Sequence, residues 1–266
     1  SGYAEMLRSI RLRIEFIVQR KTKIALTITS TQSGDGKTFI STNMAALYAM
    51  SGRPTVLLDM DIRKPNVHDK LGLTTTYGVT NYLIGDCTLD DIILHNEAIG
   101  FDVIPAGTIP PNPGELIRSD KLTELLSILR ERYDYVVIDS SPVGLVPDAL
   151  ALIEQTDITL FVIRCMETDK RFAQQTLQNL ALNHKDKINL VLSDIMVNKS
   201  GGSYGYGYGY GYGYGYGYGY GYGNGGAYNK YGKYGKYGKY AGYYRSKLGT
   251  KTTEAPHQYI DDSDED

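Results

Sequence analysis

The sequence predicts an α/β fold, with a mostly parallel sheet and helices on both of its faces. Six short apolar or β-branched segments are candidate strands, and helical patterns separate most of them. The first strand leads into a glycine-rich loop and then a helix, which is the arrangement of a P-loop NTPase fold. In a sheet of this kind, ligands bind at the carboxyl ends of the strands.

The expected elements follow one another along the first 200 residues. A helix over residues 3–20 precedes the first strand. Strands are expected at residues 23–29, 55–59, 101–104, 135–139, 158–163 and 188–197. Further helices are expected at residues 37–50, 114–132, 148–154 and 169–184. This alternation indicates successive βαβ units.

Composition narrows the functional class. The 266 residues are 42% hydrophobic and 22% charged, with a formal net charge of −2, as in an ordinary globular protein. The 28 Lys and Arg residues are balanced in number by 30 Asp and Glu residues, so the sequence does not favour a nucleic-acid partner. No apolar run is long enough to span a bilayer, and no signal peptide opens the sequence. Two cysteines are too few for a disulfide framework, so a reducing cytoplasm is expected.

The end of the chain has a different composition. Residues 203–244 are of low complexity, with alternating Tyr and Gly followed by a Lys-Tyr-Gly repeat. Seventeen of the 24 tyrosines lie here: Tyr204, Tyr206, Tyr208, Tyr210, Tyr212, Tyr214, Tyr216, Tyr218, Tyr220, Tyr222, Tyr228, Tyr231, Tyr234, Tyr237, Tyr240, Tyr243 and Tyr244. A segment so poor in aliphatic side chains cannot repay the entropy of ordering, and it is expected to be mobile when alone.

The loop after the first strand is a candidate phosphate-binding loop. It contains Ser33, Gly34, Asp35, Gly36, Lys37 and Thr38. Two glycines allow backbone N–H groups to surround phosphate oxygens, the lysine reaches the terminal phosphates, and the threonine hydroxyl can ligate Mg²⁺. The pattern departs from the usual P-loop at Thr31, where a glycine is normally found. A chance Gly-Lys-Thr in a surface turn is the alternative interpretation of the loop alone.

Carboxylates end two of the expected buried strands. Asp59 and Asp61 follow one strand at a spacing of two, which directs both side chains to the same side, and Asp139 ends another strand. Each aspartate taken singly could simply cap the next turn. Together with the loop they form an oxygen-rich group of the kind that Mg²⁺ prefers in phosphoryl transfer.

These motifs together resemble the bacterial tyrosine kinases (BY-kinases), the P-loop kinases of capsule and exopolysaccharide synthesis. The resemblance covers almost the whole chain. It rests on the Walker A loop at residues 33–38, an hhhDxDxR motif at 57–63, a Walker B motif at 137–139 with Pro142, an ExxRxxR motif, a Pro-rich loop at 105–113 and the terminal tyrosine cluster. Phe39 departs from the small hydroxyl residue often found after the loop threonine.

The resemblance implies ATP and Mg²⁺ as cofactors and assigns roles to individual residues. The ATP-binding residues would be Ser33, Gly34, Asp35, Gly36, Lys37, Thr38 and Phe39. Thr38, Asp61 and Asp139 would hold Mg²⁺, directly or through water. Asp59 would be the base that takes the phenol proton, although the division of roles between Asp59 and Asp61 stays open. Lys37 and Arg63 complete the catalytic set, with Arg63 orienting phosphate or substrate, or serving only as a surface charge.

The resemblance also implies an assembly. Glu5, Arg8 and Arg11 share a helix face, which could be solvated and carry an i, i+3 ion pair. The resemblance implies instead that this face contacts the neighbouring protomer of a homo-oligomeric ring, whose active site receives that neighbour's tyrosines. The expected parts are an oligomerisation helix (1–22), a kinase domain (23–200) and a tyrosine-cluster tail (201–266). The implied location is the cytoplasmic face of the bacterial inner membrane, with a membrane-spanning activator region in the same or a separate chain.

Two other functions compete with the kinase. A partitioning-type ATPase that switches between monomer and dimer would share the strand-end aspartates, but it has no use for clustered tyrosines. A structural Tyr-Gly segment fused to an NTPase would associate through stacking. The four histidines lack the spacing of metal ligands, and Cys87 and Cys165 resemble small apolar residues more than nucleophiles.

Overall fold

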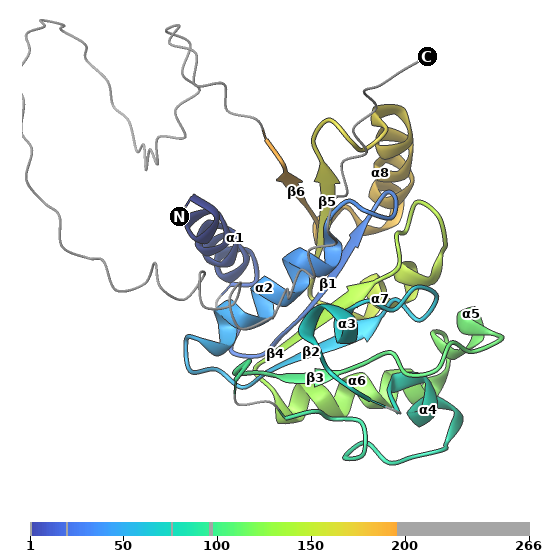
Figure 1. The fold of residues 1–266 in the computed structure, drawn as a ribbon. Coiled ribbons are helices and arrows are strands. Elements are labelled where there is room, and N and C mark those ends of the chain that lie inside the picture. Colours follow the sequence, from blue (N-terminus) through green and yellow to red (C-terminus); the bar gives the residue numbers. More distant parts are fainter. Residues whose placement is uncertain (1, 20, 76, 96–97, 196–266) are drawn as a thin grey trace, which may run out of the picture.

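The computed structural model describes residues 2–19, 21–75, 77–95 and 98–195 (Figure 1). The tyrosine-cluster tail predicted for residues 201–266, with all seventeen tyrosines assigned as phosphate acceptors, lies outside the described residues.

A six-stranded sheet forms the centre of the molecule. Its strand order is β3-β2-β4-β1-β5-β6, and every pair of neighbours is parallel. The strands are β1 (Ile24–Ser30), β2 (Thr55–Met60), β3 (Asp102–Ile104), β4 (Tyr135–Ser140), β5 (Ile158–Arg164) and β6 (Ile188–Ser193). Every residue of β1, β2 and β4 is buried, because helices cover both faces of a parallel sheet. The predicted fold class is confirmed.

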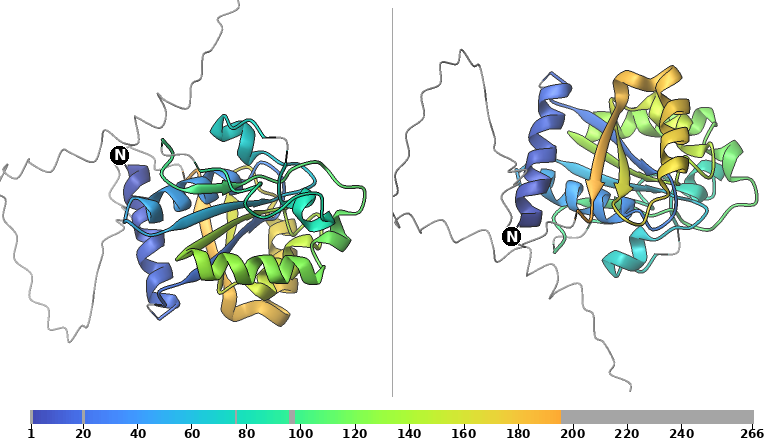
Figure 2. Two further views of the ribbon diagram at one scale, coloured as in Figure 1. Left: turned by 90° about the horizontal axis from the view of Figure 1, so that it is seen from below. Right: turned by 90° about the horizontal axis from the view of Figure 1, so that it is seen from above.

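Helices form a layer on each side of the sheet (Figure 2). They are α1 (Gly2–Ile17), α2 (Lys37–Ala49), α3 (Val67–Leu71), α4 (Val79–Ile84), α5 (Pro113–Leu116), α6 (Asp120–Arg132), α7 (Asp148–Gln155), α8 (Lys170–His184) and the short 3-10 helix η1 (Lys185–Lys187). Side chains of α1, α2 and α3 share one apolar cluster with the sheet. Those of α4, α6 and α7 form a second cluster on the opposite face, and α8 contributes to a third.

The α1 helix is held by the side chains that face α2. Leu7, Ile14 and Val18 are buried in the same cluster as Tyr48 of α2. The Tyr48 ring stacks on Tyr135 of β4, with the ring centroids 3.7 Å apart. The helix predicted over residues 3–20 is therefore present, and it packs on the domain through an apolar stripe.

Two elements differ from their prediction. The helix expected over residues 114–132 is divided into α5 and α6, because the Ser119 hydroxyl accepts the backbone N–H of Leu122 at 3.3 Å and caps a new helix. The strand expected at residues 188–197 ends at Ser193, and Asp194 adopts a left-handed conformation with φ 55°. Short helices α3 and α4 were not predicted. Within the described ranges, none of the helices combines the length and the apolar character that crossing a bilayer requires.

Candidate active site

The predicted site residues come together at the carboxyl ends of three adjacent strands. Strand β4 lies between β2 and β1, and its Asp139 pairs in register with Asp59 of β2. The loop that begins after Ser30 follows β1, on the other side of β4. The topology therefore places the glycine-rich loop and the aspartates at one edge of the sheet.

The backbone of the loop requires its two glycines. Gly34 has φ 92° and Gly36 has φ 98°, both in the left-handed region where other residues are strained. The buried carboxylate of Asp35 fixes the loop from within: it accepts the backbone N–H of Gln32 at 3.1 Å and the Thr168 hydroxyl at 2.8 Å. Ser33 is exposed at the tip. The loop is thus tied to the segment after β5.

Thr31, the departure from the usual pattern, lies against a glycine that the sequence analysis did not single out. A Cβ atom on Gly144 would lie 2.3 Å from the carbonyl oxygen of Thr31, so the loop after β4 passes directly under the phosphate loop. Thr31 is fully buried, and its hydroxyl has no hydrogen-bond partner among the described residues. Only the absence of a side chain at Gly144 allows this close approach.

Lys37 and Thr38 begin α2 and are both buried. The Ser41 hydroxyl donates to the Lys37 carbonyl at 3.1 Å, within the first turn of the helix. Phe39 is 44% exposed, so the aromatic residue that departs from the family pattern faces outward. The start of α2 therefore presents an ammonium group and a hydroxyl beside the end of β4.

Asp139, like Asp59, is almost completely buried. Burial raises its pKa, as does the charge of Asp61, whereas a hydrogen bond from Thr38 and the charge of Lys37 lower it, and the net direction is upward. Its Oδ1 atom is buried and accepts no hydrogen bond from any described residue. A buried carboxylate with one unsatisfied oxygen, and with Lys37 and Thr38 as neighbours, suits a site that receives a cation.

Asp59 is buried and holds the turn that follows β2. One carboxylate oxygen accepts the N–H of Asp61 at 3.1 Å, and the other accepts those of Asn66 at 3.3 Å and Val67 at 3.2 Å. Burial, and then the charge of Asp139, raise the pKa of Asp59 above its ordinary value, and they outweigh the hydrogen bonds that lower it. Two carboxylates on paired positions thus oppose each other's ionisation.

Asp61 is only partly buried. Its Oδ1 accepts the Ser141 hydroxyl at 2.8 Å and the backbone N–H of Lys64 at 3.3 Å. Ser141 follows the Walker B strand, and no role was predicted for it from the sequence. Among Asp59, Asp61 and Asp139, Asp61 is the carboxylate most accessible from outside.

Arg63 does not stand alone as a surface charge. Its Nε and a terminal nitrogen donate to the two carboxylate oxygens of Asp148, at 2.5 and 3.2 Å. Asp148 is buried in the first turn of α7, and this ion pair raises the pKa of Arg63. No role for Asp148 could be predicted from the sequence, because a partner 85 residues away leaves no local signal.

We predict that Arg63→Ala lowers the free energy of unfolding, because it leaves the buried Asp148 carboxylate without its cation. The expected cost is about 1–3 kcal/mol, which is usual for a buried acceptor left unsatisfied. The double variant Arg63→Ala, Asp148→Asn has no carboxylate charge at position 148, so it should recover most of the free energy of unfolding that Arg63→Ala loses. Thermal unfolding of the wild type and the two variants measures this. Equal melting temperatures for the wild type and Arg63→Ala would show that the pair contributes no stability.

The residues of the predicted oligomerisation motif pair within α1. Arg8 forms an ion pair with Glu5, and Arg11 lies 3.5 Å from Glu15. The Arg8–Glu5 pair fits the interpretation as a solvated, ion-paired face, whereas Arg11 is only 26% exposed and its Nε is buried. A subunit contact through this face stays a prediction.

The donor atoms present suit Mg²⁺ better than a transition metal. In the described part of the chain, no three His, Cys, Asp or Glu side chains are grouped closely enough to hold a metal ion by themselves. A cation at this edge would therefore take the Thr38 hydroxyl, carboxylates and phosphate oxygens, which is the ligand set of Mg²⁺ in nucleotide sites.

Comparisons with known proteins identify the family. A family model described as an AAA domain matches residues 22–192. The chain is 35% identical over 197 residues to the tyrosine-protein kinase ptk of Acinetobacter johnsonii, covering 74% of this chain but 27% of that protein. It is 32% identical to the tyrosine-protein kinase YwqD of Bacillus subtilis, covering 76% of this chain and 86% of that one. The chain thus spans about a quarter of the first relative and most of the second.

Solved structures agree with the sequence relatives. The kinase domain of the Escherichia coli tyrosine kinase ETK superposes with a TM-score of 0.69 at 30% identity, covering 76% of this chain and 80% of that domain. The septum site-determining protein MinD of Pyrococcus horikoshii, at 22% identity and a TM-score of 0.51, shows the same fold alone. The phosphate loop, the paired strand-end aspartates and these relatives lead to one conclusion: the chain belongs to the bacterial tyrosine-protein kinase family and carries a protein-tyrosine kinase domain.

Proposed function

We propose that this chain is an ATP-dependent kinase that phosphorylates its own tyrosine cluster in trans, within a homo-oligomeric ring, and thereby regulates capsule or exopolysaccharide synthesis and export. One observation carries the proposal. Lys37, Thr38 and three aspartates gather at one edge of the sheet, in a chain that also carries seventeen tyrosines between Tyr204 and Tyr244.

The binding roles follow from charge and burial. The N–H groups of the loop at residues 33–38 and the Lys37 ammonium would hold the nucleotide phosphates, with Phe39 beside them. Thr38, Asp61 and Asp139 would hold Mg²⁺, which neutralises charge on the phosphates when it is bound. A cation here would also offset the electrostatic repulsion among the buried carboxylates, and this would favour its binding.

Asp59 is proposed to accept the proton of the substrate phenol. Its raised pKa suits a base that works near neutral pH. Three backbone N–H groups hold its oxygens and the side chain is fully buried, however, so a substrate phenol can reach Asp59 only if the turn at residues 61–67 moves. Asp61, which is partly exposed, needs no such movement to meet a metal or substrate.

Transfer between chains can be tested by mixing two full-length variants. One is Lys37→Met with an intact tail, and the other is catalytically intact with the seventeen tyrosines between Tyr204 and Tyr244 replaced by Phe. We expect phosphate on the Lys37→Met chain, because an active site that reaches a neighbour's tail supplies the lost activity. Mass spectrometry distinguishes the two chains by their sequence. An unmodified Lys37→Met chain at concentrations where oligomers form would contradict transfer in trans.

The ring is expected to depend on α1 and on the charge of the tail. Replacing Glu5, Arg8 and Arg11 by Ala should give monomers without ATP. The segment from Tyr204 to Tyr244 holds four lysines and no acidic residue. Since each phosphate adds roughly 1.5 to 2 negative charges, about five would make it strongly negative and drive it from neighbouring carboxylates. Wild-type rings should therefore dissociate on phosphorylation.

Light scattering before and after Mg-ATP treatment measures both effects. Arg13→Ala, an exposed change on the same helix outside the motif, is the matched control and should keep the ring. A ring that survives heavy phosphorylation would rule out release by charge reversal, and a ring that survives the triple substitution would remove α1 from the interface.

The proposed setting is the cytoplasmic face of the bacterial inner membrane. There a membrane-spanning activator region, in the same polypeptide or a separate one, would act on this domain. Nucleic acid is not among the proposed partners, since Lys and Arg do not outnumber Asp and Glu.

A further inference from the structure

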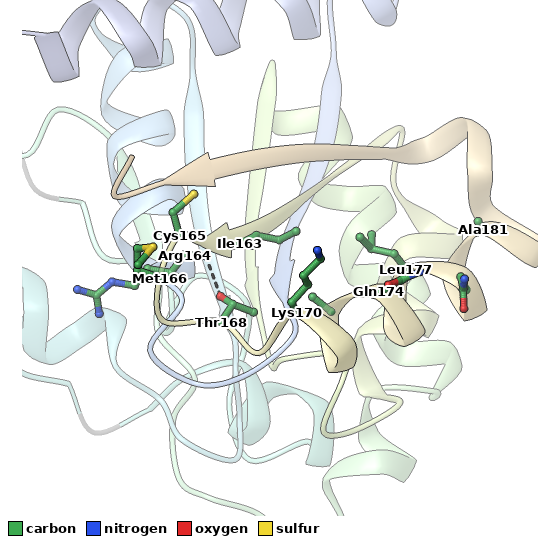
Figure 3. A pocket seen from close by; sticks show the side chains of 11 residues that line it. Ile163, Arg164, Cys165, Met166, Thr168, Lys170, Gln174, Leu177 and Ala181 are labelled. Carbon is green, nitrogen blue, oxygen red and sulfur yellow. Dashed lines mark hydrogen bonds between the residues drawn. The ribbon is translucent and has the colours of Figure 1, made fainter. Parts of the chain in front are cut away.

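An open groove lies beside the phosphate loop, on the side away from the aspartates. It has a volume of about 740 Å³ and is bounded by the end of β5, the loop that follows and one face of α8 (Figure 3). Ile163, Met166, Ala173 and Leu177 provide an apolar lining, and Lys170 and Gln174 add polar groups. The proposed kinase chemistry uses none of these side chains.

The groove is connected to the nucleotide site through its rim. The hydroxyl of Thr168, which lines the groove, donates to Asp35 inside the phosphate loop at 2.8 Å. The Gln32 side chain donates to the carbonyl oxygen of Glu167 at 3.3 Å. A segment held in the groove would therefore lie next to the loop that binds phosphate.

The chemistry of the groove suits tyrosine side chains. Met166 is 88% exposed at the rim and adopts φ 71°, so a flexible thioether is presented to solvent rather than packed. Methionine sulfur and aliphatic side chains make favourable contacts with aromatic rings. The ammonium of Lys170 can lie over a ring, and the amide of Gln174 can pair with a phenol hydroxyl.

The last described residues of the chain lie beside this groove. Cys165, which lines the groove, donates its N–H to the Ser193 carbonyl at 2.9 Å, and Arg164 pairs with Asp194 at 2.7 Å. The last described residue is Ile195, and the first tyrosine of the cluster, Tyr204, comes nine residues later. Nine residues span at most about 30 Å, which allows the chain to turn back onto the groove.

We propose that the groove binds the Tyr-Gly tract, residues 204–223, of the same chain. The tract alternates tyrosine with glycine, so an extended stretch would place all of its rings on one face. Binding in cis gains from the short tether, which keeps the tract at high effective concentration. The inference rests on the proposed function only in treating the tract as the phosphate acceptor. It adds a docking site that holds the acceptors on their own chain, apart from the neighbouring active site that phosphorylates them.

The test uses the methyl resonance of Met166 in the full chain, with no nucleotide present. A tyrosine ring packed against Met166 shifts this resonance upfield. Replacing the ten tract tyrosines by Ser should return the resonance to the chemical shift of a methionine methyl group with no ring beside it. Met60, which is fully buried elsewhere, reports on the fold and should not move. Because no phosphate transfer is measured, failure of docking and failure of the kinase assignment are distinguishable.

Matched variants of α8 locate the contact. Gln174→Glu with Gln178→Glu places two carboxylates along the groove and should abolish the Met166 shift. Gln175→Glu with Asn179→Glu adds the same charges to exposed positions that do not line the groove, and it should leave the shift intact. A shift that is absent in the wild type, or insensitive to both pairs, overturns the proposal. A shift that disappears on dilution assigns the groove to the tail of a second copy and overturns binding in cis.

Discussion

The Lys37→Met variant is expected to lose phosphorylation of its own tail by about 100-fold or more when it is incubated alone with Mg-ATP. Loss of a positioned charge that stabilises a transition state costs about this much, and phosphoryl transfer depends mainly on such charges. Lys37 is buried next to Asp139 at the start of α2, so its charge is held at a fixed position in the site. Quantitative phosphotyrosine blotting over a time course measures the loss.

The control for this variant is Lys70→Met, which removes an exposed lysine from α3. It should retain full activity. Circular dichroism should show the same helix content for both variants, since methionine occupies a similar volume to the lysine stem. Unchanged tail phosphorylation in Lys37→Met would contradict the assignment of the loop at residues 33–38 as the phosphate site.

The second large effect is expected for Asp139→Asn. This variant should be more stable than the wild type without ligand, but Mg-ADP should stabilise it less. Without ligands the variant should be more stable, because it removes a buried charge that opposes Asp59 and whose Oδ1 accepts no hydrogen bond from the described residues. An increase in melting temperature of about 2–4 °C corresponds to roughly 1 kcal/mol in a domain of this size. With Mg-ADP the variant should gain little further stability, because a carboxylate proposed to bind the metal is lost.

The same pair gives a pH dependence. Folding raises the pKa of both Asp59 and Asp139 above 3.8, so the folded chain holds protons that the unfolded chain has released. The ligand-free protein should therefore lose stability as the pH rises from about 4 toward neutrality, and Asp139→Asn should reduce this slope. Calorimetric scans across this range, with the exposed Asp69→Asn as control, measure it. Equal slopes in wild type and variant would contradict the buried repulsion.

The parts of this site that the sequence could predict are those set by local pattern. Alternation of apolar strands with helices predicted the parallel sheet, and the position of Asp59, Asp61 and Asp139 at strand ends placed them at one edge. The glycine-rich loop and its backbone conformation were predictable because its two glycines and its lysine lie within a few residues, whereas phosphate binding by it stays a prediction. Local backbone chemistry and strand polarity suffice for such features.

Most of the features that could not be predicted depend on partners distant in sequence. Gly144 has no motif of its own, and its importance appears only when its missing side chain is seen against the carbonyl of Thr31. Asp148 acquires a role because α7 brings its carboxylate to Arg63. Ser119 ends one helical pattern and caps another, which helical periodicity alone does not reveal. For Gly144 and Asp148 tertiary contact decides the outcome, whereas the Ser119 cap is a local contact with Leu122, three residues away.

The central claim is that this active site uses its own tyrosine cluster as the substrate. Mass spectrometry of residues 201–266 after incubation of the full chain with Mg-ATP tests it most directly, with Lys37→Met treated identically. We predict several phosphates on tyrosines between Tyr204 and Tyr244 in the wild type and none in the variant. A partitioning-type switch or a structural Tyr-Gly segment would hydrolyse ATP and leave the tail unmodified. A tail without phosphate in the active wild-type chain would contradict the account.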